Sequence, residues 1–491
     1  MINTSSVPII GLVIAVFVLI FLVLRTKVHP LIAMLSAACI AGLSGGMSMN
    51  ETLDSITKGF GSTLGTIGII IALGVMMGRI LEVSGAAEQI AFSFIKWLGR
   101  RREEWALALT GYLVSIPIFA DSAFVILFPV AKALSKKGKR SLITLGVALA
   151  GGLTVTHTII PPTPGPLGTA GIFGVDIGAM MLIGMALAVP CVISVVLYAK
   201  WLEKKYADDI PASIEDNELT LGPDIYQKEK SAPTLPNLWL SLLPIVVPIL
   251  LIFIKAFINL FPSLLSDGNQ IIYAVVQVFN FIGAPIIALS ISTLIAVYTL
   301  VPSLSRDATS KRLEEGLQTA GIILVVTGAG GALGAVVRDS GAGAQLAKQI
   351  IQLPISSIMI PFIVSTLIRF IQGSATVACI TTASICAPIL AQIPGVNMLI
   401  AAQATVMGAM FFSYFNDSLF WVVNRMMGVV DVKKQLTVWS VPTTIAWAVG
   451  GTSIAILNLI IGSGGTLFDP LIPLFVLALI LLVVWRKGNE Q

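Results

Sequence analysis

Long apolar stretches, separated by short polar segments, alternate along the whole of this chain. Each is close to the ~20 residues that an α-helix needs to cross the hydrocarbon core of a bilayer. The pattern predicts an all-α membrane protein with about 11 transmembrane helices. The predicted spans are 8–24, 31–47, 61–82, 141–175, 178–199, 237–260, 271–301, 317–337, 398–430, 436–461 and 468–485.

Two of these spans are interrupted by residues that a continuous helix does not accommodate. The span 141–175 holds four prolines between positions 161 and 166, and each proline removes a backbone donor and clashes with the preceding turn. The span 398–430 is interrupted by the polar run Asn416-Asp417-Ser418. Irregular backbone at membrane depth is tolerated only where protein buries it or a watery cavity adjoins it. We therefore expect two broken helices of the kind that forms midplane binding sites in secondary transporters; a kinked structural helix or a loop outside the membrane is the alternative.

Two further apolar stretches, 104–135 and 356–392, each contain a polar interruption. Basic clusters at 100–102 and 136–140 flank the first of them. A single crossing would place one cluster outside, against the positive-inside rule. Both stretches are therefore predicted to be re-entrant hairpins.

This topology places the N-terminus outside and the C-terminus in the cytoplasm. It leaves 25 of the 30 Lys and Arg residues on the cytoplasmic side, a bias that supports it. The exceptions are Lys58, Lys255, Arg338, Lys348 and Arg369.

The two halves of the chain resemble each other. Eight residues recur 256 positions later: Gly65, Ile67, Gly74, Gly78, Ser84, Gly85, Gln89 and Ala91 match Gly321, Ile323, Gly330, Gly334, Ser340, Gly341, Gln345 and Ala347. Each copy is followed by a hairpin, a broken helix and a further span, which predicts an inverted repeat with its site at the repeat interface. Small-residue packing faces alone are the alternative origin of the match. The predicted units are a first repeat at 1–200, a cytoplasmic linker at 201–236, a second repeat at 237–462 and an extra transmembrane helix at 463–491.

Composition agrees with a membrane protein. Apolar residues make up 56% of the 491 residues and charged residues only 11%, which excludes a soluble globular chain. The net charge of +5 reflects topology, so the expected partner is a lipid bilayer and not a nucleic acid. The four cysteines lie in apolar segments without metal-ligand spacing, so neither a metal nor a cofactor is expected. The run Val7–Leu24 lacks a basic start and a cleavage site, and is read as a retained span.

Four charged or titratable residues, Asp121, His157, Arg369 and Asp417, fall at bilayer depth. Each costs several kcal/mol there unless it is paired or hydrated, so each is a functional candidate. The planar fork of Arg369 suits a substrate carboxylate. Its alternative role is a structural ion pair with Asp417.

Asp121 is the preferred proton carrier, because a carboxyl group shielded from water can bind and release a proton near neutral pH. Capping of the hairpin tip is its alternative role. The proton-coupling candidates are Asp121, His157 and Asp417, and His157 is equally compatible with packing. The substrate-binding candidates are Arg369, Ser374, Thr376, His157, Thr163, Ser122, Asn416 and Ser418.

At these residues the chain resembles the gluconate permease (GntP) family of proton symporters, within a larger ion-transporter superfamily. The resemblance is carried by Gly59–Gly65, Thr156–Pro166, Arg369 with Gln372–Ala378, and Asn416–Ser418. It implies proton-coupled uptake of gluconate or a related sugar acid or hydroxy acid, such as glycerate or D-serine, across the bacterial inner membrane.

Two positions depart from the family pattern. Thr163 stands where the family often has a second histidine, and Phe119-Ala120-Asp121 stands where it often has Phe-Phe-Glu. The acid is kept in a shorter form, so the pocket and the coupling are expected to differ from the family pattern.

Two other functions compete with this interpretation. A sodium-coupled carboxylate transporter of the same superfamily would bind Na⁺ through Ser374, Thr376 and Asn416. An intramembrane enzyme is disfavoured, because the chain has no HExxH zinc motif and no serine–histidine pair with an orienting group. The expected partners are a small organic anion and H⁺, with Na⁺ and a homodimer left open.

Overall fold

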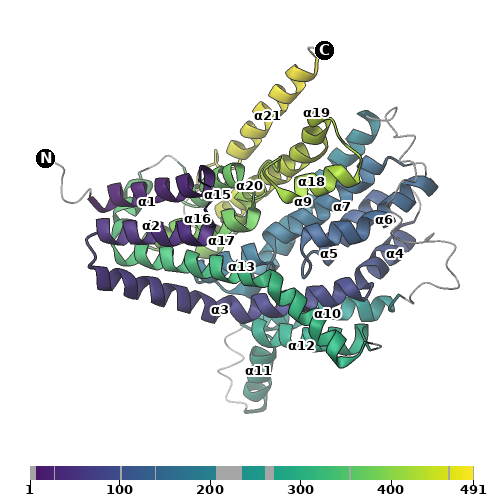
Figure 1. Ribbon diagram of the computed structural model, residues 1–491, viewed down its shortest axis with the longest axis horizontal. Helices are drawn as coiled ribbons and strands as arrows, with labels where there is room; N and C mark the ends of the chain where they lie inside the picture. Colours follow the sequence, from purple (N-terminus) through teal and green to yellow (C-terminus); the bar gives the residue numbers. More distant parts are fainter. Residues whose placement is uncertain are drawn as a thin grey trace.

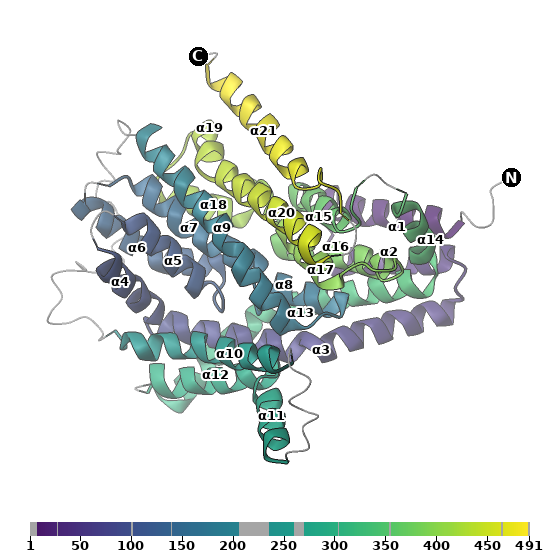
Figure 2. The same ribbon diagram turned by 180° about the vertical axis from the view of Figure 1, so that it is seen from behind.

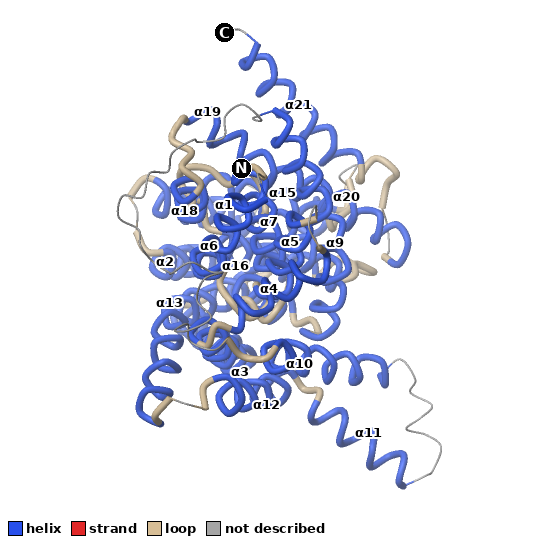
Figure 3. The backbone as a smooth tube through the Cα atoms, turned by 90° about the vertical axis from the view of Figure 1, so that its right-hand side faces the viewer, coloured by secondary structure: helices blue, strands red, loops and turns tan. Residues whose placement is uncertain are grey.

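The computed structural model describes residues 7–26, 28–99, 102–138, 140–205, 235–259, 270–302, 304–352, 355–462 and 465–489. Their regular structure is helical throughout, with no strand among them (Figures 1 and 3). Six of these helices are long and apolar enough to cross a membrane, or seven if one bent pair is counted as a span. Most of the other predicted spans coincide with shorter apolar helices. The prediction of an all-α membrane protein is confirmed.

The helices of the first half are α1 (Val7–Leu24), α2 (Pro30–Ser44), α3 (Met49–Val83), α4 (Ala86–Leu98), α5 (Glu103–Val114), α6 (Ala120–Gly138), α7 (Leu142–Ile159), α8 (Pro164–Phe173) and α9 (Ile177–Lys205). Those that follow are α10 (Leu238–Asn259), α11 (Gln270–Ile282), α12 (Pro285–Leu300), α13 (Arg306–Asp339), α14 (Ala342–Ile350), α15 (Met359–Gln372), α16 (Ala375–Leu390), α17 (Met398–Gly408), α18 (Ser418–Met426) and α19 (Val432–Gln435). A π-helical turn (Leu436–Ser440) leads into α20 (Val441–Ile461), and α21 (Leu471–Asn489) projects from the body (Figure 1).

The two longest helices, α3 and α13, pack along each other (Figure 1). Their backbones approach closely at glycines: a Cβ on Gly59 would lie 2.6 Å from the Gly331 carbonyl oxygen. Small residues allow this kind of contact between membrane helices. Both helices are longer than predicted: α3 begins at Met49 rather than at 61, and α13 begins at Arg306 rather than at 317. The first turns of α3 are polar, so hydropathy does not predict them. Ser48 and Glu51 form a capping box that starts the helix there.

The first predicted hairpin consists of α5 and α6. Its two ends return to the same place, because Arg140, just after α6, forms a 2.7 Å salt bridge with Glu104 at the start of α5. Lys200 of α9 lies 3.3 Å from the same carboxylate. This geometry is the one that a re-entrant hairpin requires. The flanking residues Arg100 and Arg101 lie outside the described residues.

The second hairpin consists of α15 and α16, which contact each other across a tight turn. Gly373 ends α15 with φ +82°, a left-handed conformation that glycine adopts without a Cβ clash. Ser374 then starts α16 by accepting a hydrogen bond from the Val377 amide at 3.3 Å.

Both predicted broken helices are broken where expected. α7 ends at Ile159 and α8 begins at Pro164, where a proline needs no intrahelical donor. α17 ends at Gly408 and α18 begins at Ser418.

The order of elements is the same in both halves. A long helix, a left-handed glycine, a short helix, a hairpin and a broken helix follow one another from α3 and again from α13. The two glycines are Gly85 (φ +76°) and Gly341 (φ +73°), one of the residue pairs that revealed the repeat. Figure 2 shows α9 and α20, the last long helices of the two halves, side by side. The order agrees with the predicted repeat; the inversion of the two copies in the membrane stays a prediction.

One predicted span is not a continuous helix. The stretch 271–301 forms α11 and α12, which are bent by 66° at Gly283-Ala284. Pro285 starts the second helix and cannot continue the first, because it lacks an amide hydrogen. α11 consequently projects away from the body (Figure 3). Of the predicted linker 201–236, residues 201–205 end α9 and 206–234 lie outside the described residues.

Candidate functional site

The N-termini of four helices, α6, α8, α16 and α18, lie close to one another. Ser418, the first residue of α18, donates a 3.1 Å hydrogen bond to Asp121 in the first turn of α6. Gly165 in the first turn of α8 faces α16, since a Cβ there would lie 3.3 Å from Thr376 Cα. The two hairpin tips and the two helix breaks are thus brought together, and helix N-termini favour anions.

The tip of the second hairpin is seated directly on the second break. A Cβ on Gly373 would overlap the backbone of Asn416. The Asn416 amide nitrogen donates to the carbonyl oxygens of Phe370 at 3.0 Å and Ile371 at 3.3 Å. The Tyr414 hydroxyl also donates to Phe370 O, at 2.7 Å. These bonds satisfy carbonyls that the end of α15 leaves unpaired.

A buried ion pair lies beside this contact. Arg369, whose exposed fraction is 4%, places Nη2 2.6 Å from Asp417 Oδ2. Asp417 also caps α18 by accepting from the Leu419 amide at 3.2 Å, and accepts from the Ser413 hydroxyl. The ion pair proposed as the alternative role of Arg369 is therefore present. Two donors of the guanidinium remain, because Nε and Nη1 are buried and have no hydrogen-bond partner among the described residues.

His157 lies in the last turn of α7, beside the first hairpin. Its ring centre is 5.5 Å from that of Phe119, next to the first hairpin tip. Its Nδ1 atom is buried, with no hydrogen-bond partner in the part of the chain that the structure describes. The tip itself rests on α3, where a Cβ on Gly78 would clash with the Pro117 carbonyl. His157 is thus close to the hairpin that carries Asp121, with one ring nitrogen unused.

Some of the other predicted residues contact the hairpins, and others form hydrogen bonds only within their own segment. Asn416 and Ser418 contact the two hairpins, as above, and Ser122 lies next to Asp121 in the first turn of α6. Thr163 precedes α8 and donates a 2.6 Å hydrogen bond to Ile160 O. Its hydroxyl, like that of Ser374, is already engaged within its own segment.

Three polar residues of the site were not singled out from the sequence. Ser413 donates to Asp417, and the indole nitrogen of Trp439 donates to Ser413 Oγ at 2.9 Å. Gln403 of α17 is fully buried, and its Nε2 lies 3.5 Å from Ile159 O, where α7 ends. A buried glutamine in an apolar span is a signal that could have been found. Ser413 and Trp439 carry no such signal, because the bond that joins them spans 26 positions of the sequence.

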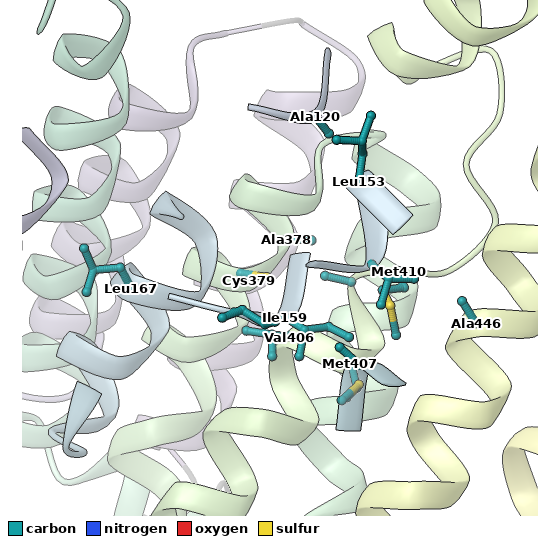
Figure 4. Packing of buried hydrophobic residues seen from close by; sticks show 14 of the residues in the cluster. Ala120, Leu153, Ile159, Leu167, Ala378, Cys379, Val406, Met407, Met410 and Ala446 are labelled. Carbon is teal, nitrogen blue, oxygen red and sulfur yellow. The ribbon is translucent and has the colours of Figure 1, made fainter. Parts of the chain in front are cut away.

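Buried apolar side chains pack beside the helix breaks. Figure 4 shows Ile159, Leu167, Cys379, Val406 and Met407, which come from α7, α8, α16 and α17 and belong to one buried cluster. This packing excludes water from one side of the breaks, which strengthens electrostatic interactions there. No group of three His, Cys, Asp or Glu side chains that could hold a metal occurs in the described part of the chain.

Long apolar helices, two helical hairpins and two broken helices that meet at a buried ion pair define this protein as a multi-pass membrane transporter. Two solved transporters have the same fold at 14% sequence identity. MtrF of Neisseria gonorrhoeae, whose structure is presented as illuminating a class of antimetabolite efflux pumps, aligns with a TM-score of 0.63 over 91% of this chain and 99% of its own. The YdaH transporter of Alcanivorax borkumensis aligns with a TM-score of 0.59 over 84% of this chain and 90% of its own.

The chain belongs to the GntP family of permeases, whose family model matches residues 7–460. It is 66% identical to an uncharacterized permease of Haemophilus influenzae over 99% of both chains. It is 34% identical to a gluconate permease of Pseudomonas aeruginosa, over 93% of this chain and 97% of the relative. A high-affinity gluconate transporter of Escherichia coli K12 is 31% identical over 92% of this chain and all of its own. The protein is accordingly a permease and not an enzyme.

Proposed function

We propose that this permease takes up gluconate or a related sugar acid or hydroxy acid together with protons, across the bacterial inner membrane. The relatives named as gluconate permeases and transporters support the substrate class. In the proposed topology the N-terminus is outside and the C-terminus is cytoplasmic.

The unpartnered nitrogens of Arg369 are the main support for this proposal. One of its guanidinium nitrogens is held by Asp417, while Nε and Nη1 have no partner among the described side chains and backbone. Buried donors without partners are costly, and a carboxylate is the acceptor that matches a guanidinium best. A substrate carboxylate bound at Arg369 would satisfy them.

The rest of the substrate would meet hydroxyl, amide and imidazole groups. Asn416 Oδ1 and His157 Nδ1 are buried acceptors or donors with no partner in the described chain, so both can bind substrate hydroxyls. Ser418, Ser122, Ser374, Thr376 and Thr163 follow at the starts of α18, α6, α16 and α8. The four helix N-termini would favour the anionic substrate over a neutral polyol.

The balance of negative and positive charges at the site favours proton coupling. The site holds two carboxylates, Asp121 and Asp417, against one guanidinium, and an organic anion adds a third negative charge. Protonation of Asp121 before the anion enters removes one charge, which links the two binding events. The Ser418 hydroxyl beside Asp121 can serve both states, since it can donate to a carboxylate or accept from a carboxylic acid. His157 is the second candidate for the proton.

A ligand screen with purified protein tests the substrate class. Gluconate, glycerate, D-serine and the neutral polyol sorbitol are compared by the shift of the thermal unfolding midpoint, at fixed pH with and without Na⁺. A shift with a hydroxy acid and none with sorbitol is expected, independent of Na⁺. A shift that requires Na⁺ would favour the sodium-coupled alternative, and a shift with sorbitol alone would exclude the carboxylate site.

A further inference from the structure

Ser413 lies in the non-helical segment between α17 and α18 and is almost completely buried, with an exposed fraction of 1%. It is the donor to Asp417 Oδ2, the same oxygen that pairs with Arg369. This oxygen therefore accepts from two donors, one of which is Arg369, the proposed ligand of the substrate carboxylate. The serine hydroxyl can hold the carboxylate where it binds one guanidinium nitrogen and leaves two open.

Ser413 is itself held by three side chains around the start of α20. The Trp439 indole nitrogen donates to its hydroxyl at 2.9 Å, and the Ser440 hydroxyl donates to its carbonyl oxygen. Its amide donates to the Thr443 hydroxyl at 3.1 Å. All polar atoms of Ser413 are thus used, and each of these partners is buried.

The local backbone on both sides of this contact is irregular. Trp439 and Ser440 end the π-helical turn Leu436–Ser440, a conformation that occurs often at functional sites. Phe412, next to Ser413, has φ +33°, in the region that side chains rarely adopt. Such a conformation persists only where the surroundings hold it. The bonds of Ser413 with Trp439, Ser440 and Thr443 provide that hold.

We propose that Ser413, held by Trp439, Ser440 and Thr443, is a positioning residue that fixes Asp417 against Arg369 and thereby keeps the substrate-binding donors of Arg369 open. The proposal rests on the proposed function, because it assumes that Arg369 binds the substrate. Without the Ser413 hydroxyl, Asp417 can rotate and cover a second guanidinium nitrogen. The substrate carboxylate then has to displace Asp417 from this second nitrogen before it can bind Arg369.

The test is a double-mutant cycle on the affinity of the purified full-length protein for D-gluconate. Ser413→Ala removes only the hydroxyl and keeps the amide and carbonyl bonds to Thr443 and Ser440. It should raise the Kd for gluconate about tenfold, the size expected for one hydrogen bond to a charged group. In an Asp417→Asn background the same change should leave the Kd unaltered, because Ser413 acts only through Asp417.

Two further variants make the cycle decisive. Trp439→Phe removes the indole donor while keeping a buried aromatic ring. It should also raise the Kd for gluconate, but by less than Ser413→Ala does. Ser384→Ala is the matched control, since Ser384 is also fully buried but donates to Ile380 O within its own helix, at 2.7 Å. It should leave gluconate affinity unchanged.

The outcomes separate this proposal from the function on which it rests. A Kd for Ser413→Ala within twofold of wild type, or effects that multiply fully in the double variant, would overturn the positioning role. If Arg369→Gln also binds gluconate normally, or wild type does not bind it, the proposed substrate site is wrong as well. The thermal unfolding midpoints of the same variants are also measured without gluconate. The losses of Ser413→Ala and Asp417→Asn should be non-additive there, and this readout remains even if Asp417→Asn abolishes binding.

Discussion

Replacement of Arg369 by lysine keeps the positive charge of the proposed site but removes the planar guanidinium group. Arg369 is 4% exposed and pairs with Asp417 at 2.6 Å. Lysine keeps the positive charge, so Asp417 is not left as an unpaired buried charge, a change that costs about 3–5 kcal/mol. What is lost is the planar fork, which can bind Asp417 and a substrate carboxylate at the same time.

The expected loss in substrate binding follows from the donors that disappear. Nε and Nη1 are the unpartnered donors, and a hydrogen bond to a charged group contributes about 1.5–3 kcal/mol. Arg369→Lys should therefore weaken binding by roughly tenfold or more, with the unfolding midpoint little changed. Arg369→Gln should lose binding and stability together.

Titration calorimetry with gluconate and thermal unfolding of the same samples measure the two effects. Arg425→Lys is the matched control: Arg425 is exposed on α18 and stacks 5.5 Å from the Trp421 ring centre, away from the ion pair. It should bind gluconate like wild type. Wild-type affinity in Arg369→Gln would refute the carboxylate role of Arg369.

Three further predictions follow from the same structure. Asp121→Asn should mimic the protonated acid in proteoliposomes, retaining gluconate counterflow while losing accumulation driven by a pH gradient; if accumulation persists, the proton site lies elsewhere and His157→Gln is the next variant. Arg101→Cys and Lys137→Cys should both react with an impermeant thiol reagent only from the cytoplasmic side, and labelling of Lys137→Cys alone from outside intact cells would contradict the first hairpin. Glu104→Gln should lower the free energy of unfolding by about 2 kcal/mol, because Glu104 is fully buried against Arg140 and Lys200; Glu203→Gln, at the rim of the same cluster, should cost less, and equal losses would show that burial does not decide the effect.

The hairpins and helix breaks could be predicted because strong local chemistry marks them. The prolines between 161 and 166 cannot continue α7, and the basic clusters at 100–102 and 136–140 argue against a single crossing. The contact of Arg369 with Asp417 was predicted only as the alternative role of Arg369, on the ground that charged groups at membrane depth require partners.

Other features depend on contacts that no local pattern reports. The first turns of α3 are polar, so hydropathy missed them although Ser48 caps the helix at that point. The bend between α11 and α12 had a signal in Pro285, which the apolar run around it masked. Ser413 was not identified for a different reason: it lies only four residues from Asp417, but the bonds to Trp439, Ser440 and Thr443 that hold it in place form only in the folded chain.

Proton movement during gluconate entry shows whether the two are transported together. Wild-type protein is reconstituted into vesicles that contain a pH-sensitive dye, in Na⁺-free buffer with the membrane potential clamped, and gluconate is added outside. Entry of protons with gluconate should acidify the vesicle interior, and Asp121→Asn vesicles should show gluconate exchange without acidification. Gluconate entry into wild-type vesicles without acidification, or entry only after Na⁺ is added, would contradict proton-coupled uptake.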